Sequence, residues 1–148
     1  MKLILIFLSS IVLNSGIDQP WLTNLNQAKK IAVEKNELIL LNFSGSDWCG
    51  PCMRMRKEIF EASEFKAFAN DKLVLVNADF PRSKKNKLSK EQSTENDSMA
   101  EQYNSNGKFP FTLLLTADGK ILKEWEGLPD AKASEFVEQL KKYTEKLK

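Results

Sequence analysis

The sequence predicts an α/β fold in which helices flank a mixed β-sheet. Two apolar runs of strand length, 38–43 and 72–80, each follow a helical pattern, the arrangement that gives parallel strands. Two further strand-like runs within residues 110–125 are joined at Asp118-Gly119, a strong hairpin signal. The sheet is therefore expected to be parallel in its N-terminal part and to end in an antiparallel C-terminal hairpin.

The first helix is expected within residues 20–37. Its apolar residues recur at helical spacing, and they include Leu25, Ala28 and Ala32. Asn24 with Gln27 forms a capping box at its start. The run that follows, "LILLNF", is continuously apolar, as expected of a strand buried on both faces.

Two more helices are expected later in the chain. One begins near Cys49 and continues to the region of Glu61, and its apolar positions are Met53, Met55, Ile59 and Phe60. The last occupies residues 130–148, with Asp130 as its N-cap. One face of this last helix carries larger or apolar side chains, namely Ala133, Phe136, Val137, Leu140, Tyr143 and Leu147.

Residues 1–16 are typical of a secretory signal peptide, which leaves 17–148 as the folded domain. Lys2 supplies the positive start, residues 3–13 form the apolar core, and small residues suited to cleavage follow. The apolar core is too short to cross a bilayer as a helix, which takes about 20 residues. We expect an exported, periplasmic protein without stable membrane insertion after cleavage. An N-terminal membrane anchor or full secretion is the alternative.

The composition excludes several kinds of chemistry. The chain of 148 residues has no histidine, which removes Ser-His-Asp and Cys-His catalysis and histidine-ligated metals. Its net charge of +2 is too small to indicate nucleic acid as a partner. We therefore expect no metal and no cofactor.

One stretch, residues 82–97, is unusually charged. Its first part, "RSKKNKLSK", has five basic residues and no acid, and its second part, "EQSTEND", has three acidic residues and no base. We expect a solvated loop inserted into the domain, with a docking surface for a partner as the alternative. Exposed charge pairs contribute about 0–1 kcal/mol each, so the segment matters little to stability.

The two cysteines of the chain, Cys49 and Cys52, lie within "SGSDWCGPCMRM". As a structural crosslink they would close a very short loop, worth about 2 kcal/mol against about 4.7 kcal/mol for a loop of about 100 residues. As a zinc site they lack the further cysteine or histidine ligands that zinc normally takes. Redox chemistry is therefore the favoured interpretation, ahead of a structural disulfide and of a metal site.

The two thiols occupy positions that fit different roles in disulfide exchange. Cysteines at i and i+3 on the first turn of a helix are close enough to form a disulfide that reopens readily. Cys49 lies at the expected helix N-terminus, where unpaired backbone N–H groups stabilise a thiolate, so it is the expected nucleophile. Cys52, one turn further in and more shielded, is the expected resolving thiol. Pro51 fits the first turn, where the N–H it lacks has no helical partner.

The motif "WCGPC" (48–52), between a buried strand and a helix, resembles the active site of the thioredoxin superfamily. The resemblance covers residues 20–148 at the level of element order and implies a thioredoxin fold. "FPFTLLLTADGKIL" (109–122) is similar to the strand and hairpin that carry the family's cis-proline, which implies a cis bond at Pro110. "WLTNLNQAKKIAVEKNELILLNFSGSDWC", "EIF" and "NADFP" resemble exported bacterial thioredoxin-like proteins of the thiol:disulfide interchange group.

The resemblance also implies roles around a redox-active disulfide between Cys49 and Cys52. The residues expected to support that disulfide or to bind substrate are Trp48, Gly50, Pro51, Phe109 and Pro110. The tryptophan flanks the disulfide as a platform, and the Gly-Pro dipeptide sets the redox potential. The backbone of the phenylalanine together with the proline forms a substrate shelf, along which a peptide would pair like an added strand.

The chain departs from the family at one buried position. The family usually has a buried aspartate in the strand before the motif, where it accepts the proton of the resolving cysteine, and here Asn42 takes that place. The lysine that often accompanies it on the next strand corresponds to Leu75. Because an amide takes no proton at working pH, deprotonation of Cys52 is expected to be slower than in a typical member. Water or Glu58 is the alternative acceptor.

The function implied by the resemblance is that of a protein-disulfide reductase of the cell envelope, acting through the Cys-Gly-Pro-Cys dithiol. Its expected partners are disulfide-containing client proteins and a membrane electron donor, and we expect a monomer that binds no nucleic acid. A net oxidase or isomerase is the alternative within the enzyme class, since the redox potential decides the direction. A non-enzymatic client-binding or assembly factor that uses the shelf is the alternative outside it.

Overall fold

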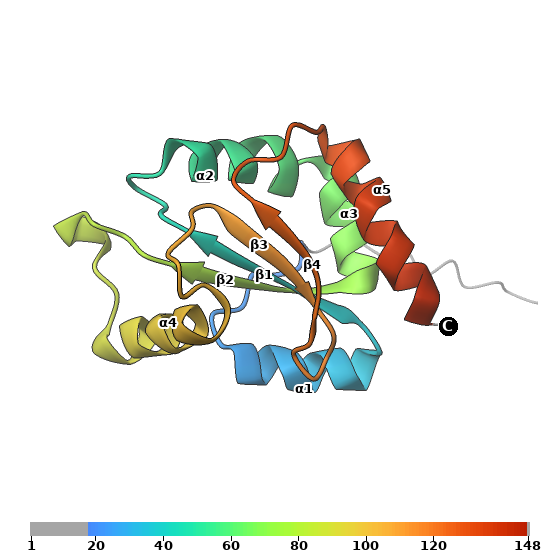
Figure 1. Ribbon diagram of the computed structural model, residues 1–148, viewed down its shortest axis with the longest axis horizontal. Helices are drawn as coiled ribbons and strands as arrows, with labels where there is room; N and C mark the ends of the chain where they lie inside the picture. The colour runs from blue at the N-terminus through green and yellow to red at the C-terminus, as the bar shows by residue number, and fades with distance from the viewer. Residues whose placement is uncertain (1–17, 148) are drawn as a thin grey trace, which may run out of the picture.

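Four strands form one mixed sheet in the order β2-β1-β3-β4 in the computed structural model, which describes residues 18–147 (Figure 1). β1 lies parallel to β2 and antiparallel to β3, and β3 is antiparallel to β4. The predicted mixed sheet is therefore confirmed. The bounds of the strands are Leu38–Ser44 for β1, Leu73–Asp79 for β2, Phe111–Leu115 for β3 and Ile121–Glu126 for β4.

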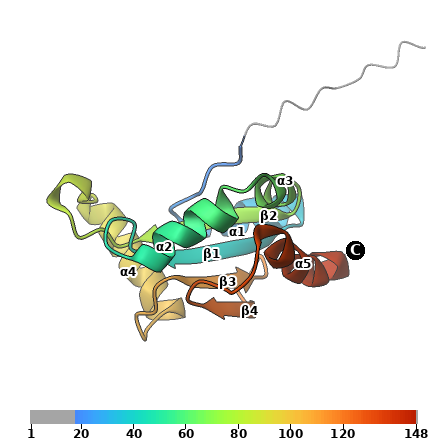
Figure 2. The ribbon, with the colours of Figure 1, turned by 90° about the horizontal axis from the view of Figure 1, so that it is seen from above.

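Helices cover both faces of this sheet (Figure 1, Figure 2). One face is covered by α1, Leu25–Lys35, and α4, Lys90–Tyr103. The other face is covered by α2, Gly50–Met55, its π-helical continuation η1, Arg56–Phe60, and by α3, Ser63–Lys72, and α5, Ala133–Thr144. Short 3-10 turns occupy Lys84–Asn86 (η2) and Glu145–Leu147 (η3).

The central strand β1 is buried along its whole length, which explains its continuously apolar sequence. Leu38 and Leu40 pack in the core beneath α2, α3 and α5. The alternate residues Ile39, Leu41 and Phe43 pack in the core beneath α1 and α4. Asn42 and Ser44 follow the leucines on the same face. The alternation therefore places two polar side chains on the α2 side of the sheet, at the end of β1 nearest the cysteines.

Side chains at the helix starts decide where two of the helices begin. Asn24 accepts a hydrogen bond from the N–H of Gln27 at 2.8 Å, so the predicted start of α1 is confirmed. α5 begins after Lys132, whose own N–H donates to the carboxylate of Glu135 at 2.8 Å. The prediction of Asp130 as the N-cap is wrong, because the chain enters the helix only after residue 132.

The charged segment 82–97 is not one loop, since its second half lies in α4. This helix begins after Ser89, whose hydroxyl accepts the N–H of Gln92 at 3.1 Å. Its buried residues are Asn96 and Met99. A helix with so few buried apolar residues carries no apolar stripe, so helical spacing does not reveal it. The prediction of a solvated loop is wrong for this half of the segment.

The region between the cysteines and β2 contains two helical pieces rather than one. The predicted helix from Cys49 to the region of Glu61 is present as α2 and η1, and it is followed by α3, which was not predicted. Within α2, Met55 is buried as expected, but Met53 is 46% exposed. Met53 is therefore a surface residue of α2 rather than part of the apolar face.

The predicted signal peptide, residues 1–16, lies outside the described residues, as does the side chain of Leu147. The domain boundary at residue 17 therefore stays a prediction. Among residues 18–147 there is no helix with the length and apolar character needed to cross a membrane.

Candidate active site

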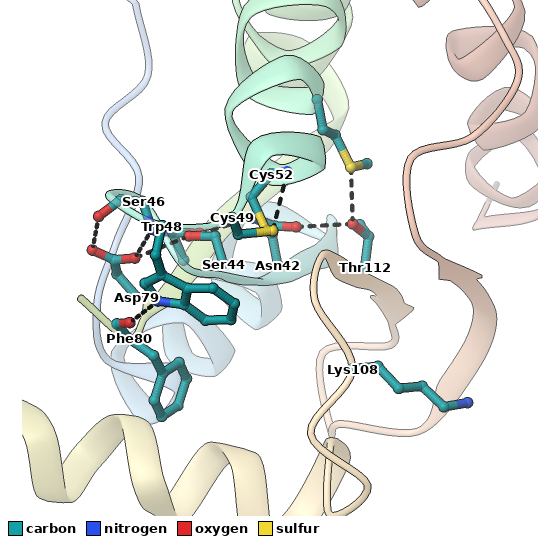
Figure 3. The surroundings of a disulfide bond; sticks show 12 residues. Asn42, Ser44, Ser46, Trp48, Cys49, Cys52, Asp79, Phe80, Lys108 and Thr112 are labelled. Carbon is teal, nitrogen blue, oxygen red and sulfur yellow. Dashed lines mark hydrogen bonds between the residues drawn. A yellow bond between two sulfur atoms is a disulfide. The ribbon is translucent and has the colours of Figure 1, made fainter. Parts of the chain in front are cut away.

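Cys49 and Cys52 form a disulfide at the first turn of α2, with their Cα atoms 5.2 Å apart (Figure 3). Cys49 is the N-cap residue of this helix, and its Sγ accepts a hydrogen bond from the backbone N–H of Cys52 at 3.3 Å. Pro51 lies in the first turn, as predicted. The helix N-terminus therefore presents an N–H group to the sulfur of Cys49, which is the contact that stabilises a thiolate.

The two cysteines are equally buried in this disulfide, each being 5% exposed. The prediction that Cys52 is the more shielded is wrong for the oxidised protein, because the bond holds both side chains together at the same turn of the helix. Burial therefore does not separate their roles. The difference between them is the N–H that Cys49 accepts at the start of α2.

Trp48 belongs to an aromatic cluster beside the disulfide (Figure 3). Its indole N–H donates to the carbonyl of Phe80 at 2.7 Å. Its ring meets Phe109 edge-on with centroids 5.4 Å apart, and the rings of Phe80 and Phe109 are 5.5 Å apart. The guanidinium of Arg82 lies 3.7 Å from the centroid of the Trp48 ring. The Trp48 indole is thus held by a hydrogen bond to Phe80, by the ring of Phe109 and by the guanidinium of Arg82.

Gly45 makes room for this indole. A Cβ atom at position 45 would lie 2.3 Å from Cε2 of Trp48, far closer than carbon atoms approach one another. Only glycine therefore fits here unless the tryptophan moves. The sequence alone does not reveal this requirement, because it arises only when the folded loop brings the Trp48 side chain against the backbone of Gly45.

The peptide bond between Phe109 and Pro110 is cis, as the resemblance implies. Asn104 holds the loop before it, since its Oδ1 accepts the N–H of Lys108 and its Nδ2 donates to the carbonyl of Lys108, both at 2.9 Å. The carbonyl of Pro110 accepts the N–H of Gly127 at 2.9 Å. In the described part of the chain the backbone N–H and carbonyl of Phe109 have no partner, so they remain available to an added strand.

Polar side chains from three strands are hydrogen-bonded beneath the disulfide (Figure 3). Asn42 donates from Nδ2 to Oδ1 of Asn77 at 2.9 Å, and the hydroxyl of Thr112 donates to Oδ1 of Asn42 at 2.9 Å. Both ends of the Asn42 amide are therefore engaged. Asn77 is the residue opposite Asn42 on β2, whereas Leu75 lies opposite Leu40. Leu75, expected at the position of the family's lysine, lies on the same face of the sheet as Leu40.

A carboxylate lies at the end of this network. The hydroxyl of Ser44 is 3.3 Å from Oδ1 of Asn77 and 3.2 Å from Oδ1 of Asp79. Ser46 donates to the same carboxylate from its N–H at 2.9 Å and from its hydroxyl at 2.5 Å. Ser44 therefore links the Asn42–Asn77 amide pair to Asp79 at the end of β2.

Glu58, the alternative proton acceptor, is engaged at the surface. Its carboxylate forms an ion pair with Arg54 at 2.9 Å, and its side chain is 49% exposed. The hydrogen bond from Arg54 holds the pKa of Glu58 below its usual range, which makes it a weaker base. The structure therefore gives Glu58 the role of a solvated helix residue.

Asp47, directly before Trp48, holds the segment that follows β2. Its carboxylate accepts the N–H groups of Arg82 and Ser83 at 2.9 Å each and the side-chain amide of Asn86 at 3.0 Å. These hydrogen bonds, that from Arg82 first, hold the pKa of Asp47 below its usual range. One carboxylate thus ties the basic segment to the loop that carries the cysteine motif.

The sequence and the fold of this chain match known proteins. A family model described as a thioredoxin-like domain matches residues 25–144. The chain belongs to the thioredoxin-like family. The solved structure of the DsbH oxidoreductase superposes on this thioredoxin-like protein with a TM-score of 0.78 at 31% identity, covering 88% of this chain and 87% of that one. A thioredoxin from Thermus thermophilus, at 14% identity and a TM-score of 0.63, covers 85% of this chain and 87% of its own and shows the fold alone.

Two curated relatives come from Chlamydia pneumoniae. The disulfide bond reductase DsbH is 38% identical over 96 residues, which are 65% of this chain and 56% of DsbH. The thioredoxin-related protein DsbJ is 38% identical over 60 residues, which are 40% of this chain and 17% of DsbJ. The thioredoxin-like protein therefore spans about half the length of the first relative and a smaller part of the second.

The structure brings the predicted site residues into one region and adds others to them. Trp48 and Phe109 are in contact, and a Cβ added at Gly50 meets nothing within 4 Å. The residues that sequence reasoning missed include Gly45, Asp47, Asn77, Asp79, Phe80, Arg82, Asn104 and Thr112. An aspartate beside the motif and an arginine in a basic run were visible signals, but their partners lie more than thirty residues away in the chain.

Proposed function

We propose that this thioredoxin-like protein is a thiol:disulfide oxidoreductase that reduces the disulfides of client proteins. The observation that carries the proposal is the disulfide between Cys49 and Cys52 at the start of α2, beside a cluster that contains the cis Phe109–Pro110 bond. The name of the relative DsbH, disulfide bond reductase, supports the same chemistry.

The proposed reaction is two successive thiol–disulfide exchanges. In the reduced protein the thiolate of Cys49 attacks one sulfur of the client disulfide, and the other client sulfur leaves as a thiolate that takes up a proton. Cys52 then loses its proton and attacks the sulfur of Cys49, which forms the Cys49–Cys52 disulfide and releases the second client thiol. The client gains two electrons and two protons. Both electrons come from the protein dithiol, while one proton comes from the Cys52 thiol and the other from solvent, because Cys49 reacts as a thiolate.

Client binding is assigned to the substrate shelf. The unpaired backbone groups of Phe109 offer one donor and one acceptor to an extended client segment, in the manner of strand addition. Trp48 lies against the ring of Phe109 and forms the neighbouring wall. An extended client would therefore lie across Phe109 with its disulfide near Cys49.

The reducing direction is part of the proposal and is set by the redox potential. We assign the dipeptide Gly50-Pro51 to the control of this potential, because it separates the two thiols. A potential near that of thioredoxin, about −270 mV, supports reduction, and one near that of DsbA, about −120 mV, supports oxidation. A net oxidase or isomerase is the alternative that this measurement distinguishes.

The cellular setting follows from the N-terminal segment. We propose that residues 1–16 direct export and are removed, and that the protein acts as a monomer in the periplasm. After each turnover the Cys49–Cys52 disulfide needs two electrons, which we assign to a membrane-bound dithiol donor. Disulfide-containing exported proteins are the proposed clients.

The proposed activity is tested by reduction of insulin with dithiothreitol as the electron source. Cys49→Ser and Cys52→Ser are each expected to abolish turnover, because either variant lacks one thiol of the pair. Met53→Ser serves as the matched control, since it introduces the same residue at an exposed neighbouring position. Turnover that survives both cysteine substitutions contradicts the proposal.

A trapping experiment separates the enzyme from a client-binding module. Cys52→Ser is expected to accumulate mixed disulfides between Cys49 and its clients, because the resolving thiol is absent. Cys49→Ser serves as the control that traps nothing. Binding of clients without any mixed disulfide or turnover would support the binding module instead.

A further inference from the structure

A basic segment, residues 82–90, lies beside the candidate active site. It projects beyond the sheet at the end where β1 and β2 finish and where α2 begins (Figure 1). In the described part of the chain none of its cations forms an ion pair with a carboxylate. These exposed cations are Arg82, Lys84, Lys85, Lys87 and Lys90. The basic segment thus carries five positive charges within nine residues, and none of them is in an ion pair within the described part of the chain.

The basic segment is held in place from two sides. The carboxylate of Asp47 accepts hydrogen bonds from Arg82, Ser83 and Asn86. On the other side Asn96 of α4 donates to the carbonyl of Asp79 at 2.7 Å, directly before the segment. The basic segment is therefore anchored to the loop that carries Trp48 and to α4.

A recess of about 260 Å³ opens between the basic segment and α4. Three of the cations line it, together with the apolar side chains of Phe80 and Leu88. Two carboxylates, Asp79 and Asp97, also line it, and Asp79 is already hydrogen-bonded by Ser44 and Ser46. The cations in the recess are Arg82, Lys84 and Lys87. The three cations therefore exceed the two carboxylates around this recess.

The recess is continuous with the substrate shelf through stacked side chains. The Arg82 guanidinium lies on the face of Trp48, and Trp48 in turn contacts Phe109. A client segment that lies along the backbone of Phe109 and continues past Trp48 reaches the basic segment next. Residues that flank the client's reactive cysteine would therefore meet these cations.

We propose that the basic segment 82–90 binds an acidic stretch of the client polypeptide next to the disulfide that is reduced. The proposal rests on the proposed function and adds a preference among clients to it. Unpaired cations beside a reaction site raise the local concentration of oppositely charged partners and their rate of encounter. Asp or Glu side chains of the client fit the cationic rim.

The docking part of the proposal is tested without any redox reaction. The oxidised protein is titrated with three peptides of equal length that lack cysteine and carry glutamate, glutamine or lysine at the same positions, and amide shifts are followed by NMR. The glutamate peptide is expected to shift the amides of residues 82–90 and the indole N–H of Trp48, while the other two leave them in place. Equal shifts with all three peptides, or shifts elsewhere on the surface, overturn it. Equally tight binding of a single-stranded oligonucleotide also overturns it, because the segment would then bind any polyanion.

The kinetic part uses a charge-matched pair of variants. The triple variant K84Q/K85Q/K87Q removes three charges from the segment, and K30Q/K142Q/K146Q removes three exposed lysines elsewhere. The first is expected to lower the ratio of the rate constants for an acidic and a neutral disulfide peptide by about tenfold, which is about 1.4 kcal/mol shared by three exposed charges. The second leaves the ratio unchanged. A ratio that falls equally in both variants overturns the proposal, because net charge alone would then explain it.

The two parts separate this inference from the proposed function. If the glutamate peptide shifts residues 82–90 but no disulfide peptide is reduced, the function fails and the acidic docking site stands. If insulin is reduced and the ratio for wild-type protein is near one, the function stands and the acidic preference fails.

Discussion

The hydroxyl of Thr112 on β3 donates a hydrogen bond to Oδ1 of Asn42 on β1, at 2.9 Å, on the side of the sheet that carries the disulfide. The other end of the same amide donates to Asn77 on β2. Asn42 is therefore a neutral group engaged at both ends of its amide, at the position where the resemblance implies an ionisable one. The site is built to keep a polar but uncharged side chain beneath the cysteines.

Asn42→Asp is expected to speed the resolving step. A carboxylate at this position can accept the proton of Cys52, which the amide cannot, so the mixed disulfide on Cys49 should decay faster above the pKa of the new carboxyl. The protein should also lose about 1–3 kcal/mol of unfolding free energy, because the new carboxylate would be a buried charge that no longer donates to Asn77. Stopped-flow decay of the mixed disulfide and urea denaturation measure the two effects.

Asn42→Leu is the matched control for that variant. It removes the same hydrogen bonds with the same number and branching of side-chain heavy atoms and adds no proton acceptor, so it should destabilise the fold without speeding the resolving step. Equal decay rates for wild type and Asn42→Asp would show that the proton of Cys52 leaves by another route.

Thr112→Val is expected to destabilise the protein by about 1–3 kcal/mol. Valine keeps the shape of threonine but leaves the buried Oδ1 of Asn42 without its donor. Equilibrium unfolding in urea measures the loss. Thr23→Val, at an exposed position, is the control and should stay within about 0.5 kcal/mol of wild type. Equal stabilities for the two variants would mean that the buried hydrogen bond contributes nothing.

Gly45→Ala is expected to displace the indole of Trp48 and to slow client reduction. The new Cβ would overlap the indole ring, so Trp48 must leave its contacts with Phe109 and Arg82 or the loop must move, at a cost of about 1–3 kcal/mol. Near-ultraviolet circular dichroism reports the indole, and thermal unfolding reports the cost.

Gly50→Ala is the steric control for this prediction, since an added Cβ there meets nothing within 4 Å. Its near-ultraviolet spectrum and its unfolding temperature should stay close to those of wild type. If Gly45→Ala leaves the tryptophan signal unchanged as well, the loop has room that the structure does not show.

The basic segment is expected to loosen from Asp47 only in acid. Because hydrogen bonds, from the Arg82 N–H first, lower the pKa of Asp47 in the folded protein, their contribution is complete above the ordinary carboxyl pKa of about 4. It is lost as the pH falls through the lowered folded pKa. The amide signals of Arg82 and Ser83 and the side-chain amide of Asn86 should therefore titrate together below about pH 4 in NMR spectra.

Asp47→Ala is the control for the titration, because it removes the acceptor and should leave the same amides without the shared midpoint. A midpoint above about pH 5 in the wild type would mean that the hydrogen bonds do not favour the ionised carboxyl.

Several features of this protein depend only on residues that are close together in the chain. The buried strand β1, the cap of α1 at Asn24 and the start of α2 at Cys49 follow from residues within one or two turns of each other. The spacing of the two cysteines is likewise read from the motif, and their disulfide is present. These signals are local, so the chain shows them before it folds.

Other features depend on contacts between segments that are far apart in the chain, and only the folded protein shows them. α4 escaped prediction because its buried Asn96 is held by the backbone of Asp79 rather than by an apolar stripe. The register that pairs Asn42 with Asn77, and the stacking of Arg82 on Trp48, each join residues more than thirty positions apart. Such contacts depend on how strands align and loops pack, and no spacing along the chain encodes them. They decide which side chains hold the Asn42 amide beneath Cys49 and Cys52, and they bring Arg82 onto the face of Trp48.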